Sequence, residues 1–222
     1  MRTMTAMAAV LALSACATTA TGADNPRVAL ETDAGRMVLE LELARAPLTV
    51  CNFLRYLSAG DYELGQFTRT VVRETNANPN PIDVIQAVVP GGEEVAFPPI
   101  PLERTRDTGL SHTAGAVSMA RDGPDTATSS FFIVTQDTPS LDFGGARNPD
   151  RQGFAVFGHV VEGLEVARAI QMSPADDQEQ LIPPVAGLAQ ADLARADPAG
   201  RQGRHAGGTS PIRVAERMAT GG

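Results

Sequence analysis

The chain of 222 residues has no lysine, no tryptophan and only two cysteines. Its 18 basic residues are therefore all arginines, and 26 acidic residues outnumber them to give a net charge of −8. The arginines form no basic cluster of the kind that binds nucleic acid, so we expect no nucleic acid partner. An acidic surface favours solubility, and peptides fit it better than polyanions as partners.

The motifs that several enzyme classes require are also absent. No G-x-S-x-G elbow, P-loop or dinucleotide fingerprint occurs, so the chain lacks the central residues of hydrolases, NTPases and dehydrogenases. Asp142-Phe143-Gly144 matches a kinase tripeptide by chance, because the other kinase motifs are missing. The three histidines, His112, His159 and His205, stand far apart without neighbouring ligands. We therefore expect no metal site and no cofactor.

The apolar run at the N-terminus is too short to span a bilayer as a permanent helix. We interpret residues 1–15 as a secretory signal peptide. Leu13–Cys16 resembles a bacterial lipobox, which implies lipidation of Cys16, with residues 16–26 as the lipidated cysteine and its tether. Ordinary signal cleavage is the alternative. Ala17 stands where an aspartate would resemble an inner-membrane retention signal, so we expect an outer-membrane anchor in the bacterial cell envelope, with the domain in the periplasm.

The two cysteines, Cys16 and Cys51, are not expected to form a disulfide. Cys16 lies in the targeting segment, whereas Cys51 lies inside a predicted amphipathic helix. We interpret Cys51 as a small buried hydrophobic residue with no redox role.

The mature part begins with a pattern that predicts a hairpin and a helix. Apolar residues alternate on both sides of a turn at Asp33–Gly35, as in a half-buried β-hairpin. Pro47 opens a segment with apolar residues at helical spacing, and Gly60 is placed to end it. Residues 164–170 form a second short amphipathic stretch. The segments between are rich in β-branched residues, aromatics and turn formers, which is typical of a closed antiparallel barrel.

The C-terminal part has a different composition. Residues 173–210 are rich in Ala, Asp, Gly and Pro, which predicts an enlarged loop. Pro211–Ala215 is then expected to be the final strand. One domain over residues 27–216 follows, with a tail at 217–222, and we expect a monomer.

Three segments resemble the cyclophilins, a family of peptidyl-prolyl cis-trans isomerases. Ser118–Val134, in which small turn-forming residues lead into a strand, resembles the family's signature segment. Arg27–Tyr62 resembles its opening hairpin and helix, and Phe154–Ile170 its closing strand and helix. The resemblance implies a mainly β fold, a closed eight-stranded antiparallel β-barrel capped by two α-helices. It also implies rotation about Xaa–Pro bonds of proline-containing polypeptides, without a cofactor.

Arg69 is the catalytic residue that the resemblance implies. Rotation about the peptide bond has a barrier of about 20 kcal/mol, because the nitrogen lone pair delocalises into the carbonyl. A cation near the prolyl nitrogen and an apolar pocket for the ring together lower that barrier. Arg69, in Phe67-Thr68-Arg69, matches the arginine of the family's F-H-R motif. Without the resemblance, an arginine between two threonines would be interpreted as a solvated surface charge.

Two further residues match the family's F-M-x-Q segment. Gln86 matches the glutamine that hydrogen-bonds the substrate backbone, and Val84 stands at the methionine that lines the proline pocket. Asp83 stands at the phenylalanine, and Ala87-Val88 replaces a pair of glycines. The resemblance therefore implies a pocket whose shape differs from the family's usual one.

The signature segment adds four substrate-binding residues. Ala120 and Arg121 match positions whose backbone pairs with the substrate. Phe132 matches the phenylalanine at the base of the proline pocket, while Phe131 alternates to the opposite face. Core packing is the other interpretation of Phe132. Ser130 replaces a glutamine that helps to orient the bound peptide.

Two residues complete the predicted groove. Leu141 matches the leucine that packs on the substrate ring, beside Ser140 in place of an aromatic residue. Phe154 replaces a histidine or tyrosine at the rim. Because of these departures, two hypotheses remain. One is an isomerase that assists the folding of envelope proteins, with an altered preference for the residue before proline; the other is a weak or inactive module that binds Pro-containing segments.

Overall fold

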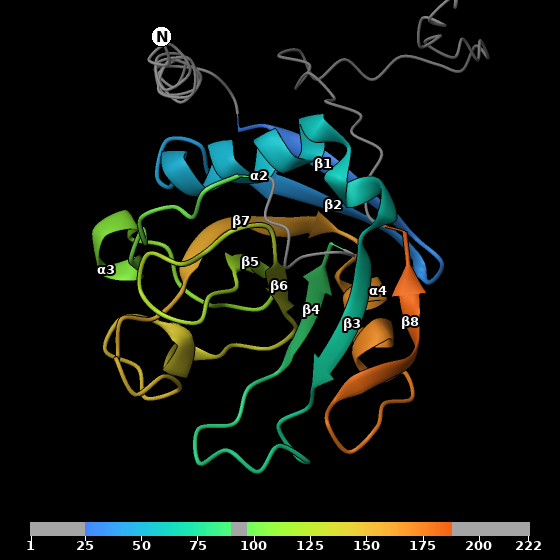
Figure 1. Cartoon of the computed structure of the whole chain (residues 1–222). Coiled ribbons are helices and arrows are strands. Elements are labelled where there is room, and N and C mark those ends of the chain that lie inside the picture. The colour runs from blue at the N-terminus through green and yellow to red at the C-terminus, as the bar shows by residue number, and fades with distance from the viewer. Residues whose placement is uncertain (1–24, 90–96, 188–222) are drawn as a thin grey trace, which may run out of the picture.

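The computed structural model describes residues 25–89 and 97–187 (Figure 1). Four expected features lie outside the described residues: the signal peptide, the lipidation of Cys16, the strand Pro211–Ala215 and the tail at 217–222. Within the described ranges, no helix is long and apolar enough to cross a membrane.

Eight strands form one antiparallel sheet in the order β1-β2-β7-β5-β6-β4-β3-β8. This confirms the mainly β, eight-stranded antiparallel fold expected from the resemblance. The strands are β1 Arg27–Thr32, β2 Gly35–Leu41, β3 Gln66–Val71, β4 Val84–Val88, β5 Ala116–Met119, β6 Phe131–Val134, β7 Ala155–Glu162 and β8 Gln180–Ala186.

The sheet curls until its two edge strands approach each other, which makes it a near-barrel (Figure 1). The N–H of Asp33, in the turn after β1, donates to the carbonyl of Ala186 at the end of β8, at 3.1 Å. Next to it Gly187 has a φ of +95°, and a Cβ there would lie 2.5 Å from the carbonyl oxygen of Glu31. Glycine is therefore required where the two edges meet.

Two helices pack against the sheet as predicted. Helix α2 (Pro47–Ala59) has proline in its first turn and ends at Gly60 in the left-handed conformation. The Glu103 carboxylate accepts hydrogen bonds from two backbone N–H groups of its first turn. Helix α4 (Leu164–Gln171) packs against β2, β3 and β4. A four-residue helix α3 (Thr105–Thr108) and two 3-10 turns, η1 (Asp61–Leu64) and η2 (Pro139–Leu141), complete the described helical elements.

An aromatic cluster lies in the core between α2 and the sheet. Phe53 of α2 is fully buried and contacts the rings of Tyr62, Phe131 and Phe157, with centroids 5.0 to 5.5 Å apart. The Tyr62 hydroxyl donates to the carbonyl of Ser129 at 2.6 Å, and burial raises the pKa of Tyr62. Since Phe131 belongs to this cluster, its neighbour Phe132 points to the other face of β6.

Three expectations from the sequence are wrong. The segment expected to be an enlarged loop, residues 173–210, contains the strand β8 at Gln180–Ala186. Pro183 and Pro184 conceal the alternating pattern. They are tolerated because β8 lies at the sheet edge, where β3 is its one strand partner among the described residues. Cys51 is half-buried on α2 rather than fully buried, and it is disulfide-bonded rather than free.

Candidate active site

A groove of about 450 Å³ lies over β3, β4 and β6. It is lined by every substrate-contacting residue expected from the resemblance: Arg69, Val84, Gln86, Ala120, Arg121, Ser130, Phe132, Leu141 and Phe154. The fold thus brings together positions that are spread over more than a third of the chain.

Apolar side chains form the floor of the groove, which we define as Val84, Phe132, Leu141 and Phe154. Phe132 is 5% exposed, and its ring meets that of Phe154 at right angles with a centroid distance of 5.3 Å. Such a pair of walls has the shape and polarity that a proline ring needs. Phe132 is therefore both a core residue and a pocket wall, so the two interpretations of its role are compatible.

The ring of His112 packs behind this floor. Its ring stacks on Phe132 at 6.0 Å with an interplanar angle of 11°. Nδ1 lies 2.6 Å from Asp142 Oδ1, and Nε2 lies 2.9 Å from the Ser118 hydroxyl. Burial lowers the pKa of His112, and the hydrogen bond to Asp142 opposes part of that shift. The neutral ring thus donates from Nδ1 to Asp142 and accepts at Nε2 from Ser118.

The order Ser118, His112, Asp142 reproduces the hydrogen-bond pattern of a nucleophilic triad. Ser118, however, has no exposed surface. Its hydroxyl cannot reach a peptide in the groove, so the three residues support the floor instead of attacking a substrate.

Arg69 reaches the groove from β3. The pairing of β3 shifts register between Phe67 and Arg69 on both sides, toward β4 and toward β8. An irregularity of this kind re-aims a side chain. The Arg69 guanidinium donates from Nη1 to Gln86 Oε1 at 3.4 Å, and Gln86 is its register partner on β4. The predicted catalytic arginine and substrate-binding glutamine are therefore neighbours.

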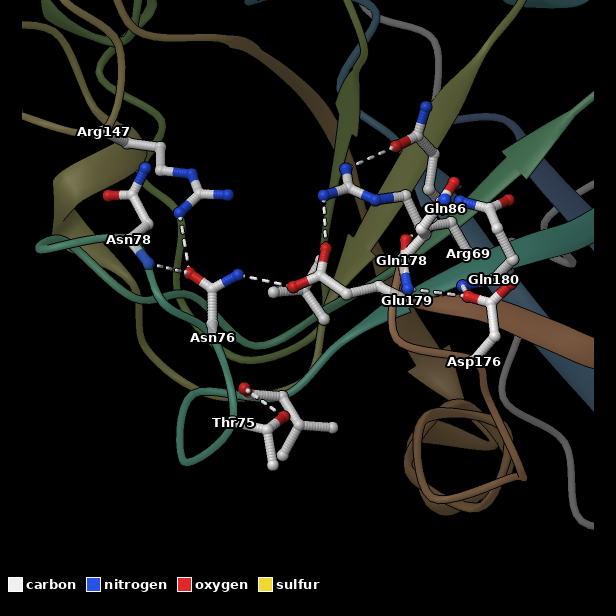
Figure 2. Close-up of polar contacts among 12 residues, drawn as sticks. Arg69, Thr75, Asn76, Asn78, Gln86, Arg147, Asp176, Gln178, Glu179 and Gln180 are labelled. Carbon is white, nitrogen blue, oxygen red and sulfur yellow. Dashed lines mark hydrogen bonds and ion pairs between the residues drawn. The ribbon is translucent and has the colours of Figure 1, made fainter.

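A second partner of Arg69 was not found from the sequence. Glu179, just before β8, accepts from Arg69 Nη2 at 2.5 Å, across 110 residues of sequence (Figure 2). Its backbone carbonyl accepts from the N–H of Thr70 at 2.9 Å, which ties the residue to β3. Because this glutamate stands in a segment expected to be a loop, no local pattern could have indicated it.

The polar contacts continue from Glu179 to the other side of the groove (Figure 2). Glu179 Oε1 accepts from the side-chain amide of Asn76, and Asn76 Oδ1 accepts from Arg147 Nη1 at 3.0 Å. Arg147 Nη1 also donates to the carbonyl of Asn80 at 3.2 Å. We call Arg69, Glu179, Asn76 and Arg147 the rim network.

The side chain of Arg121 makes contacts that the sequence did not indicate. Its side chain has no exposed surface and forms a bidentate ion pair with Asp150, at 2.7 and 3.0 Å. The hydrogen bonds from Arg121 lower the pKa of Asp150. The guanidinium also lies 5.0 Å from the centre of the Phe154 ring. The backbone N–H of its neighbour Ala120 donates to the carbonyl of Ser130, so this N–H already has a hydrogen-bond acceptor within the chain.

The structure corrects the expectation for Asp83. Its side chain is 1% exposed and turns away from the groove, where it accepts from Arg73 Nε at 2.6 Å and from the Arg73 backbone N–H at 3.0 Å. Ile82 lines the groove instead. An apolar wall is therefore present, although the sequence match placed a carboxylate there. Ser140 is not among the residues that line the groove.

Several other lining residues were missed: Asp122, Thr126, Thr128, Arg147 and Asn148. They lie in the connections before β6 and before β7, where the sequence shows no alternation or helical spacing. Among the residues that the structure describes, no group of three or more His, Cys, Asp or Glu side chains is arranged to hold a metal ion.

Residues 27–187 match the family model described as cyclophilin type peptidyl-prolyl cis-trans isomerase. The chain belongs to this family. It is therefore a cyclophilin-type peptidyl-prolyl cis-trans isomerase, and the matched range contains the whole groove.

Relatives with similar sequences agree with this assignment, and a solved structure has the same fold. The cyclophilin is 36% identical over 153 residues to the peptidyl-prolyl cis-trans isomerase cyp18 of Streptomyces antibioticus, which covers 65% of this chain and 82% of that protein. It is 35% identical over 176 residues to peptidyl-prolyl cis-trans isomerase A of Dickeya dadantii, covering 76% and 83%. A cyclophilin-type isomerase from Cryptosporidium parvum, crystallised in the presence of the dipeptide Ala-Pro, shares the fold with a TM-score of 0.59 and 21% identity, covering 72% and 94%.

Proposed function

We propose that the groove of this cyclophilin holds the proline ring of a polypeptide on its apolar floor while Arg69 lowers the barrier to rotation. A guanidinium near the prolyl nitrogen favours the pyramidal nitrogen of the transition state, and it gains more there than in the planar ground state. The observation that carries the proposal is the position of Arg69 on the same groove as Phe132 and Leu141.

Gln86 and Glu179 support this role. Each binds one terminal nitrogen of the Arg69 guanidinium, so the planar group has a defined orientation. A fixed donor loses less conformational freedom when the transition state forms. We infer that Gln86 and Glu179 are positioning residues for Arg69 and that Gln86 also contacts the substrate backbone.

The test is cis/trans exchange of short Xaa-Pro peptides, measured by NMR with the parent protein and with Arg69→Ala. We expect the parent to accelerate exchange and the variant to lose about a hundredfold of that acceleration, as for the removal of one transition-state donor. Peptide affinity should fall much less, because the ground state uses this interaction less. Exchange that is equally fast with the variant would exclude the proposed role.

A second function is favoured by one observation. Arg69 is already paired with Glu179, and a guanidinium engaged by a carboxylate has less of its charge available for a substrate. The protein could then act as a module that binds Pro-containing segments without turning them over. Peptide binding with no acceleration of exchange, across several residues before proline, would support this alternative.

We also propose that the protein assists folding in the bacterial cell envelope, as a lipoprotein facing the periplasm. The support is the lipobox-like Leu13–Cys16 and the slow uncatalysed isomerisation of proline. The mass of the N-terminal peptide tests lipidation, with Cys16→Ser as the variant and Cys51→Ser as its matched control. We expect the lipid to be lost only from Cys16→Ser. Cys51 is disulfide-bonded, and Cys16 is the other cysteine of the sequence. One thiol cannot carry both bonds, so the same mass measurement decides between them: a Cys16 found in a disulfide would contradict lipidation.

A further inference from the structure

Arg147 is the one arginine of the groove that has no carboxylate partner among the described residues. The groove is lined by Arg69, Arg121 and Arg147. Arg69 is paired with Glu179 and Arg121 with Asp150. Arg147 instead donates only from Nη1, to the neutral oxygens of Asn76 and Asn80. Its Nε and Nη2 groups make no hydrogen bond within the part of the chain that the structure describes.

The surroundings of Arg147 favour a negative charge. Partial burial lowers the pKa of Arg147, and the positive charge of Arg69 lowers it further. Glu179 opposes these two effects, but its influence is the smallest of the three. The guanidinium groups of Arg69 and Arg147 lie on either side of Asn76 and Glu179 (Figure 2). An additional anion at Arg147 would therefore relieve an excess of positive charge.

Asn76 holds the Arg147 guanidinium in place for such an anion. Its Oδ1 accepts from Arg147, while its Nδ2 is bound by Glu179. The backbone N–H of Arg147 donates to the carbonyl of Ser140, next to Leu141 of the floor. Arg147 and Leu141 also line the same groove, so the free donors of Arg147 belong to the site that is expected to hold the proline ring.

We propose that Arg147 binds the carboxylate of an aspartate or glutamate within two residues of the substrate proline. This inference deepens the isomerase function proposed above and rests on it. It assigns to the groove a preference for substrates with one acidic residue next to Xaa–Pro.

Acidic residues of the protein around Arg147 restrict the position at which a substrate carboxylate is favoured. Asp122 lines the same groove from the connection between β5 and β6, where its backbone N–H donates to Thr126. A second hollow, of about 820 Å³, is also lined by Arg147, together with Asp176, Asp177 and Glu179. A carboxylate is repelled near these groups and attracted only where Arg147 faces the groove.

The experiment compares blocked peptides with a central Ala-Pro in which one residue, within two positions of the proline, is either Glu or Gln. For each pair, kcat/KM for isomerisation is measured by NMR exchange at low salt. We expect Glu to exceed Gln by about fivefold at one position, as for a charge-assisted contact at a partly exposed site. Raising the ionic strength should reduce this ratio.

Variants of Arg147 make the test specific. Arg147→Gln should bring the Glu/Gln ratio to about one, and Arg147→Glu should invert it. Arg36→Gln removes the same charge from the exposed surface of β2, far from the groove, and should keep the parent ratio. A parent ratio of one at all positions, or a ratio that survives Arg147→Gln, would overturn the inference.

A failure of the proposed function would look different. If none of the peptides were isomerised faster than in buffer, catalysis would be disproved. The Glu/Gln ratio would then be taken from dissociation constants in NMR titrations of the same peptides. A ratio near one in these constants would overturn the role of Arg147, whereas a preference for Glu that is lost in Arg147→Gln would support it.

Discussion

The floor and the rim network of the groove are built in different ways. The floor residues Val84 and Phe132 stand on β4 and β6, two paired central strands of the sheet, and they are buried. In the rim network only Arg69 stands on a strand, and the other members come from connecting segments and remain partly exposed. The floor therefore has its shape from core packing, whereas the rim network depends on a few polar contacts. Changes in the floor should alter stability and activity together, and changes in the rim network should alter mainly activity.

The largest effect is expected from the floor. Phe132→Ala removes a ring that packs between His112 and Phe154, so it should reduce the free energy of unfolding by about 3 kcal/mol. Phe132→Leu keeps most of the apolar volume and should cost about 1 kcal/mol. Urea unfolding at neutral pH measures both values. If Phe132→Ala unfolded at the same urea concentration as the parent protein, the packing of the floor would not contribute to stability, which would contradict the comparison.

Arg69→Lys should have the next largest effect. The substitution keeps the positive charge but removes the planar fork that Gln86 and Glu179 hold from two sides. We expect kcat to fall about thirtyfold, with less change in KM and little change in stability. NMR exchange and urea unfolding test the two parts separately. A loss of stability as large as that of Phe132→Ala would remove the distinction between rim and floor.

Glu179→Gln examines a rim residue that the sequence did not reveal. The amide keeps the size of the side chain but not its charge, so Arg69 should become less well oriented and kcat should fall about fivefold, with KM nearly unchanged. Glu165→Gln, on the exposed face of α4, has the same change in net charge and serves as the control. An increase in kcat would show that Glu179 restrains Arg69 instead of positioning it.

The smallest effect is a dependence of stability on pH that arises behind the floor. Burial lowers the pKa of His112 and of His159 below the usual value of 6.5. The unfolded chain therefore takes up protons first, and stability should fall as the pH drops below about 6.5. His112→Gln should make this decrease shallower, with His159 accounting for the remainder. Urea unfolding at several pH values between 7 and 5 measures the slopes, and equal slopes would contradict the assignment to His112.

Elements with a strong local pattern could be predicted from the sequence. The hairpin of β1 and β2 follows from alternation around a glycine turn, and α2 follows from Pro47, the apolar spacing and Gly60. The residues of the floor could be located because a strand alternates its side chains, so that Phe131 and Phe132 must face opposite sides. β8 could not be recognised, because prolines on an edge strand conceal its pattern.

The floor could thus be assigned from short motifs, because neighbouring residues on a strand have their relative orientation set by the backbone. Two features depended on tertiary structure. One is the set of partners that Arg69 binds, and the other is that Ile82 lines the groove where the sequence match had placed Asp83. Glu179 meets Arg69 across 110 residues only because the sheet curls and places β8 beside β3. Asp83 turns inward because Arg73 and Gln171 satisfy its carboxylate there. Contacts of this kind depend on which segments become neighbours in space, and a local sequence pattern contains no information about that.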